Sequence, residues 1–175
     1  MANFIISSGR KEVCLDSIGG LDAFYAIPYT DNAFTILDGE VTALDAGVTA
    51  AYKFELRADA NTLTSDGTAD ENTGVLLYAE TLTVFLKKQD KETNVQVELL
   101  QKGLHYFVVK TRNGEYQLVG SLDGARATAT NTVSGGARSD GNGYNLTITA
   151  NSKIMTPMLD EATVTALLAI VAEDS

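Results

Sequence analysis

Side chains suited to covalent or acid–base chemistry are few in this sequence. Its 175 residues include one histidine, His105, and one cysteine, Cys14. A catalytic nucleophile needs a base beside it, and His105 lies in the most apolar of the expected strands, where a structural histidine is the usual occupant. Cys14 has only Arg10 and Lys11 as nearby basic residues, so we interpret it as a small half-buried side chain. The sequence therefore predicts a protein that is not an enzyme.

Ligands for metals and cofactors are also scarce. A structural zinc site needs several cysteine or histidine ligands, and this chain has two such residues in total. Oxygen ligands that calcium accepts occur between residues 66 and 72, but their spacing does not match an EF-hand loop, so a solvated segment is the simpler interpretation. These ligands are Asp66, Asp70, Glu71 and Asn72. We expect no metal and no cofactor.

Composition indicates one mainly β domain covering residues 1–175. The chain is 45% hydrophobic, contains two prolines, and has turn-forming residues at short intervals, as antiparallel β structure does. The expected architecture is an antiparallel β-sandwich or barrel with one flanking helix, a long protruding hairpin and a C-terminal helix.

Charge and hydropathy restrict the partners of the chain. The N-terminus lacks the features of a signal peptide, and the longest nearly apolar run, 166–172, is far shorter than the about 20 residues that cross a bilayer. We therefore expect synthesis in the cytoplasm and no membrane partner. The net charge of −10 argues against a general phosphate-binding surface. It favours either solubility alone or a surface to which passing DNA does not adhere.

Turn signals and alternation predict a series of short strands. Asp38-Gly39 and Asn113-Gly114 are the two strongest hairpin signals, and Pro28 indicates the end or edge of a strand. Apolar residues on both faces of 104–110 predict a central strand covered from two sides. The expected strands are 21–29, 34–37, 40–44, 104–110, 115–119, 124–130 and 144–150.

Two segments are expected to be helical. Residues 90–102 fit either helical or strand spacing, but Asp90 is a suitable N-cap and Gly103 a suitable left-handed C-terminal stop. A second helix within 157–172 has Asp160 as its cap and an apolar stripe. The stripe consists of Val164, Leu167, Leu168 and Val171. This stripe packs either on the protein's own sheet or on another subunit.

Residues 49–86 carry the most informative pattern in the sequence. Two alternating segments, of roughly nine and thirteen residues, flank a polar segment, 58–73, with almost no apolar side chains. Strands usually have about 5 to 6 residues, so a hairpin of these two would project from a compact body and need a partner. The polar segment is either a mobile surface loop or a loop that becomes ordered on a neighbouring subunit.

The order of these elements over residues 21–154 resembles the tail tube proteins of tailed bacteriophages. The resemblance rests on the long hairpin with its polar loop, the helix near 90–102, and the runs NGEYQLVG and DGNGYNLTITA, which are similar to sequences of phage virion proteins, particularly of Bacteroidetes hosts. In that family a β-sandwich with a flanking helix assembles into stacked, usually hexameric rings. The resemblance does not account for the C-terminal helix, which a related ring at the head-to-tail junction could carry.

The resemblance implies roles for the hairpin residues. The polar loop would contact the adjacent ring, and strands from several subunits would close a barrel around a DNA channel. The implied inter-ring residues are Leu63, Asp66, Asp70 and Glu71, and the candidate lumen-facing residues are Lys53, Glu55, Arg57, Thr81 and Thr83. The cationic members of the second group do not suit a channel through which DNA slides, so the opposite strand faces could line it instead.

The leading hypothesis is therefore a structural virion protein that assembles with itself and with other tail or connector proteins, while DNA passes through without being held. One alternative within the virion is a head–tail connector or decoration protein. An alternative from another class is a carbohydrate- or ligand-binding β module, with Tyr144 or Tyr116 in its site. A third is an enzyme with two acidic residues facing across a cleft, which alternation alone does not reveal.

Overall fold

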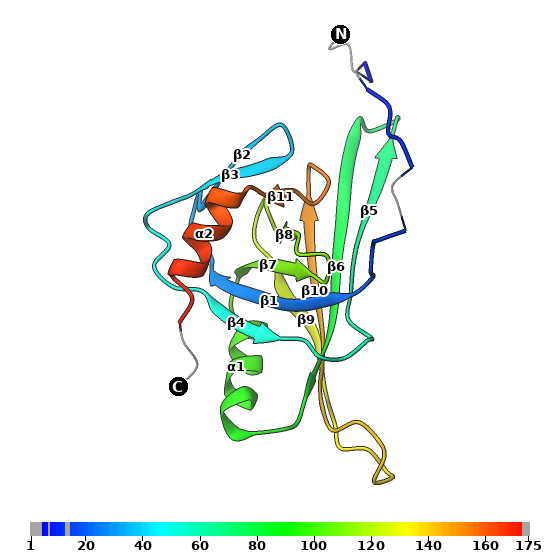
Figure 1. Cartoon of the computed structure of the whole chain (residues 1–175), viewed down its shortest axis with the longest axis vertical. Coiled ribbons are helices and arrows are strands. Elements are labelled where there is room, and N and C mark those ends of the chain that lie inside the picture. Colours follow the sequence, from blue (N-terminus) through cyan, green and yellow to red (C-terminus); the bar gives the residue numbers. More distant parts are fainter. Residues whose placement is uncertain (1–4, 7, 13–14, 173–175) are drawn as a thin grey trace.

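The computed structural model describes residues 5–6, 8–12 and 15–172, which form eleven strands and two helices (Figure 1). In chain order these are β1 (Leu21–Pro28), β2 (Phe34–Leu37), β3 (Glu40–Leu44), β4 (Tyr52–Glu55), β5 (Thr62–Asp70), β6 (Val75–Lys87), α1 (Lys91–Lys102), β7 (His105–Thr111), β8 (Tyr116–Val119), β9 (Arg126–Val133), β10 (Gly143–Ser152), β11 (Met158–Leu159) and α2 (Glu161–Ala169). The prediction of a mainly β fold is confirmed.

The strands form two sheets packed face to face. The seven-stranded sheet has the order β2-β3-β11-β8-β7-β1-β4, and the four-stranded sheet has the order β5-β6-β10-β9. Their strands cross steeply in Figure 1. Pairing is antiparallel except between β11 and β3. Among the described strands the two sheets do not join into a closed barrel, so the sandwich, and not the barrel, is the observed architecture.

Both faces of the seven-stranded sheet are buried. On β1, Phe24 and Ala26 face a core shared with the four-stranded sheet and α1, whereas Tyr25 and Ile27 face a second core under α2. The neighbouring strand β7 likewise places Phe107 in the first core and Val108 in the second. The prediction that 104–110 is a central strand covered on both sides is confirmed.

Helix α1 closes one end of the space between the sheets. The Asp90 side chain accepts a hydrogen bond from the Thr93 N–H at 2.6 Å, as the N-cap prediction requires. Val97 and Leu100 are buried in the first core. The prediction for Gly103 was wrong in one respect, because its backbone is extended, with φ of −97°, and not left-handed. Its N–H still donates to the Leu99 carbonyl and closes the last turn.

Helix α2 packs on the protein's own sheet and is shorter than the predicted 157–172. Asp160 caps it as expected, accepting from the Thr163 N–H at 2.7 Å. Leu167 is fully buried in the second core, while Val164 and Val171 pack at its border. Leu168 was wrongly included in the apolar stripe, since it is 47% exposed.

The predicted pairing within 49–86 was wrong. The first segment contributes β4, which pairs with β1 at the edge of the seven-stranded sheet, and Phe54 stacks on Phe24 at 4.7 Å between ring centroids. The true partner of β6 is β5, which lies inside the segment 58–73 that we expected to be a loop. The arm is therefore a β5–β6 hairpin with its turn at residues 71–74, and it belongs to the four-stranded sheet.

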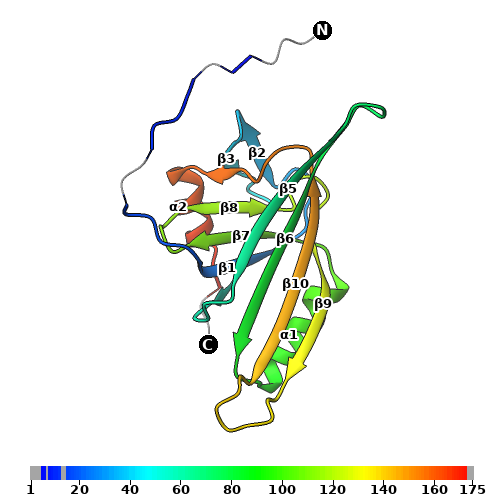
Figure 2. The same cartoon turned by 90° about the vertical axis from the view of Figure 1, so that its right-hand side faces the viewer.

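The alternation of apolar and polar residues did not reveal β5, because most of its side chains are small or polar on both faces. Only Leu63 is a large apolar residue, and it packs against the first core opposite Leu82. Towards the turn the hairpin passes beyond the body, as Figure 2 shows, so its residues there have no core to face. Main-chain pairing with β6 and the β propensity of threonine hold this part of the strand.

The two short hairpins and the strand end at Pro28 were predicted correctly. Asp38 and Gly39 both have positive φ, 52° and 83°, which is the conformation that a tight β2–β3 turn needs. Asn113-Gly114 lies in the β7–β8 turn, and Pro28 is the last residue of β1.

Within the described residues, neither helix has the length and apolar character required to cross a membrane.

We predict that Leu167→Ala lowers the free energy of unfolding by about 2–5 kcal/mol, because it leaves a cavity in a fully buried position. The matched control Leu168→Ala, on the next and half-exposed residue, should change it by less than about 1 kcal/mol. Urea denaturation measures both. Equal effects of the two substitutions would contradict the docking of α2 on the sheet through Leu167.

Candidate functional site

No other described element covers the outer face of the four-stranded sheet in Figure 2. Threonine is frequent at the centre of this face, and Leu77, Ala79 and Phe85 of β6 lie on it as well. Two rows of paired residues cross all four strands on this face. They are Thr62-Thr83-Thr147-Ala129 and Thr64-Thr81-Thr149-Arg126. The alternating residues of β6 and β10 point the other way and are buried in the first core. We call the six threonines of these rows the threonine face.

Charged residues of this sheet surface lie at its margins. Asp66 and Asp70 are towards the hairpin turn, Lys87 is at the opposite end of β6, and Arg126 is on the outermost strand, β9. The centre offers hydroxyl and amide groups, with Asn145 and Asn151 beside the threonines. Phosphate binding depends on lysine and arginine. The centre of this surface is therefore hydrophilic, but it lacks the lysine and arginine side chains that bind a nucleic acid backbone.

Both edges of the four-stranded sheet are open. The outermost strands are β5 and β9, and no described strand pairs with the outer side of either. Just before β5, the side chain of buried Asn61 takes the place of a main-chain partner of β6. Its Oδ1 accepts from the Phe85 N–H at 2.8 Å, and its Nδ2 donates to the Ala58 carbonyl at 2.8 Å. An open edge is a template for pairing with another chain.

Glu80 joins the two sheets beneath the threonine face. Its side chain is fully buried, and its Oε2 accepts from the Gly120 N–H at 2.8 Å at the end of β8. Its Oε1 accepts from the Thr156 hydroxyl at 3.3 Å. Close by, the Ser152 and Ser121 hydroxyl oxygens are 2.6 Å apart. These bonds tie β6 of one sheet to the end of β8 in the other.

Burial raises the pKa of Glu80 above its ordinary value, and the hydrogen bonds from Gly120, Thr156 and Ser152 oppose that rise only in part. All three partners are neutral. A carboxyl group whose pKa is raised by folding stabilises the folded protein most when protonated. That contribution is lost as the pH rises from its ordinary pKa through the raised one.

The structure separates the candidate lumen-facing residues into two groups. Thr81 and Thr83 belong to the threonine face. Lys53, Glu55 and Arg57 instead lie on or just after β4, at the edge of the other sheet, where Glu55 forms ion pairs of 3.0 Å with Lys53 and 3.2 Å with Arg57. These three residues line a groove between β4 and α1.

The candidate inter-ring residues are also divided. Asp66 and Asp70 are on the outer part of β5, and Glu71 is in the exposed hairpin turn. Leu63 points into the body, so its inclusion with the tip rested on the mistaken loop assignment. Among the described residues there is no group of three or more histidine, cysteine, aspartate or glutamate side chains arranged to hold a metal ion.

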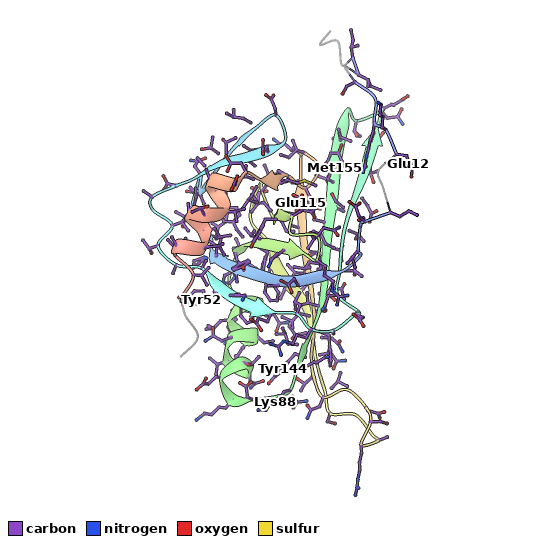
Figure 3. The ribbon with its side chains drawn as sticks, viewed as in Figure 1. Glu12, Tyr52, Lys88, Glu115, Tyr144 and Met155 are labelled. Atoms are coloured by element: carbon purple, nitrogen blue, oxygen red, sulfur yellow. The ribbon has the colours of Figure 1, made fainter. Side chains whose placement is uncertain are left out.

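The remaining candidate residues are the histidine, the cysteine and two tyrosines, and those that the structure describes pack against the body of the protein. His105 begins β7 beside Phe107; burial lowers its pKa, and its buried Nδ1 has no hydrogen-bond partner in the described chain. Tyr144 is buried, and its hydroxyl donates to the Asp90 carbonyl at 3.1 Å, beside α1 in Figure 3. It is thus inaccessible to a sugar. Tyr116 packs at the border of the second core. Cys14 lies outside the described residues.

Sequence reasoning missed the role of Glu80 and most of the threonine face. The isolated Glu80 within an alternating apolar row was a usable signal, because a charged residue at a core position needs buried partners. The threonines of β10 alternate visibly with its apolar residues. The threonines of β5 gave no such signal.

No protein-family model matches this chain, and no curated protein matches it.

We predict that Glu80→Gln becomes more stable relative to the wild type as the pH rises from 4 to 7, because the amide keeps polar contacts without a buried charge. At pH 4, Glu80→Ala should be less stable than Glu80→Gln by about 1–3 kcal/mol, since the Gly120 N–H loses its acceptor. Urea denaturation across this pH range measures both. A pH-independent difference between Gln and wild type would refute the role given to ionisation.

Proposed function

We propose that this protein is a structural component of a phage virion that assembles with itself into rings, and that stacked rings form a channel for DNA. The uncovered threonine face, bounded by two open strand edges, is the observation that carries the proposal. The overall order of elements, which resembles that of tail tube proteins, supports the same function.

The open edges support ring formation by strand pairing between copies. If β9 of one copy pairs with β5 of the next, each copy offers one edge of each kind, and the contact repeats in one direction around a ring. Closure leaves no strand edge exposed, which removes the tendency to uncontrolled pairing. The four-stranded sheets then become a continuous wall, and hexameric closure is expected from the family resemblance.

The threonine face gives the wall its chemistry. Facing inward, it presents hydroxyl groups to the channel, and the chain as a whole carries a net charge of −10. Phosphate groups meet few cations on such a wall, so DNA is not held as it passes. The seven-stranded sheet and α2 lie on the opposite side of the four-stranded sheet, towards the outside of the ring (Figure 1).

Electron microscopy and analytical ultracentrifugation of the concentrated protein test assembly. We expect closed rings with a single subunit number, alone or in stacks. A protein that stays monomeric at high concentration overturns the proposed function.

Two proline variants test the edge. Successive N–H groups of a strand point to opposite sides, so Asn131→Pro and Thr132→Pro remove donors from opposite edges of β9. The variant that loses the N–H pointing away from β10 should keep a near wild-type denaturation midpoint and form no rings. The other variant loses a bond to β10 and should lose stability. Rings from a folded protein in both cases would exclude β9 as the ring-closing edge.

The channel lining is tested by Thr83→Lys combined with Thr147→Lys, two paired positions at the centre of the threonine face. Assembled rings of this variant should bind double-stranded DNA with a steep dependence on salt, because many lysines converge on one channel. Wild-type rings should not. A control with Thr35→Lys and Thr42→Lys places the same charge on β2 and β3. Equal DNA binding by control and test rings would contradict an inward threonine face.

A further inference from the structure

The outer edge of β4 carries main-chain groups without a described partner. This strand is the last in the seven-stranded sheet, between β1 and α1 in Figure 1, and β1 is its only partner among the named strands. Just after β4, the Leu56 N–H donates to the Asp22 carbonyl at 2.8 Å, on the β1 side. Main-chain groups alternate in direction along a strand, so those of Lys53 and Glu55 point away from β1. No described residue hydrogen-bonds to them there.

The same edge already accepts a strand just before β4 begins. The Ala51 N–H donates to the Ile170 carbonyl at 3.2 Å, and the Ala172 N–H donates to the Ala51 carbonyl at 2.9 Å. The bridge that they form, between Ala51 and Val171, is parallel. Ala51 and Lys53 are two residues apart, so their main-chain groups share one side of the strand. The edge is therefore suited to strand addition beyond the point where this bridge stops.

A groove of about 570 Å³ follows this edge, and α1 forms its other wall. All four residues of β4, from Tyr52 to Glu55, line the groove. Consecutive residues of a strand point to opposite faces, so a hollow lined by both sets runs along the edge of the strand and not over one face. From α1, the lining residues are Glu92, Thr93 and Gln96. The groove thus leaves room beside the unpaired main-chain groups.

The two faces of β4 offer different chemistry to an added strand. On one face Phe54 packs against the first core, and Tyr52 is 49% exposed. On the other face Lys53, Glu55 and Arg57 lie in a row, in which the single carboxylate pairs with both cations. A strand in the groove would therefore meet an apolar surface on one side and an excess of positive charge on the other.

Lys87 adds to this positive charge. It lines the groove and takes part in none of the ion pairs found among the described residues, while its Nζ donates to the Arg57 carbonyl at 3.3 Å. The chain as a whole has a net charge of −10, so a local excess of cations is a departure from its general character. Complementary charge favours an acidic partner.

We propose that the open edge of β4 binds an extended segment of a partner protein in which apolar and polar residues alternate, with two acidic residues four positions apart. The segment pairs with the main chain of Lys53 and Glu55 as an additional strand. Its apolar side chains cover Tyr52, and its carboxylates face Lys53 and Arg57, with a neutral residue opposite Glu55. The site belongs to the seven-stranded sheet, so the inference does not rest on ring closure through β5 and β9.

A fluorescent peptide with blocked ends, Thr-Glu-Val-Thr-Val-Glu-Val, tests the site. We expect saturable binding by fluorescence anisotropy. In NMR spectra, amide hydrogen exchange of Lys53 and Glu55 should slow, while that of Phe54, which already faces β1, should change little. The same peptide with lysine in place of both glutamates should bind at least about fivefold more weakly, and salt should weaken binding of the acidic peptide.

Two variants of the groove make opposite predictions. Lys53→Glu should weaken peptide binding by about fivefold or more, since it replaces an attraction with a repulsion. Glu55→Gln should strengthen binding, because it frees two cations from their internal partner. The matched control is Lys153→Glu, an exposed lysine just beyond the end of β10 that is distant from Lys87. It should leave binding unchanged. Urea denaturation checks that each variant is folded.

Three results would overturn the proposal. The first is the absence of saturable binding to the wild type at millimolar peptide. The second is equal weakening by Lys53→Glu and Lys153→Glu, or weaker binding by Glu55→Gln. The third is slowed exchange on β5 or β9 in place of β4, which would assign the peptide to an edge of the other sheet.

Discussion

The structure depends on burying both faces of the seven-stranded sheet. Strands β1 and β7 alternate large apolar residues towards two cores, so one face must be covered by a second sheet and the other by α2. The four-stranded sheet supplies the first cover and needs only one apolar face to do so. Its other face is left free for solvent or for a function, and threonine is frequent at the centre of that face.

The first core contains a buried titratable side chain, Glu80, that hydrogen-bonds to the other sheet. Glu80 occupies a core position on β6, and the Gly120 N–H and the Thr156 hydroxyl satisfy it across the gap between the sheets. Apolar contacts have no direction, whereas these hydrogen bonds are satisfied in only one register of β6 against the end of β8. The threonine face and the edges of its sheet are thereby held in one orientation relative to the seven-stranded sheet and α2.

Strand β5 carries the open edge on which the proposed assembly depends. It is the outermost strand of the four-stranded sheet, and its acidic turn extends beyond the body in Figure 2. Edge pairing depends on main-chain groups, which are present in any strand, so it gives little choice of partner.

The sequence by itself determined the local elements and the class of fold. Asp90 and Asp160 marked the helix starts, Asn113-Gly114 marked a hairpin, and two-sided apolar content marked β7 as central, because each of these signals acts over a few neighbouring residues. Strand partners were decided only by the tertiary structure. Pairing of β6 with β5, and not with β4, depends on which side chains become buried in a core. The polar residues of β5 show no apolar alternation from which that pairing could be predicted.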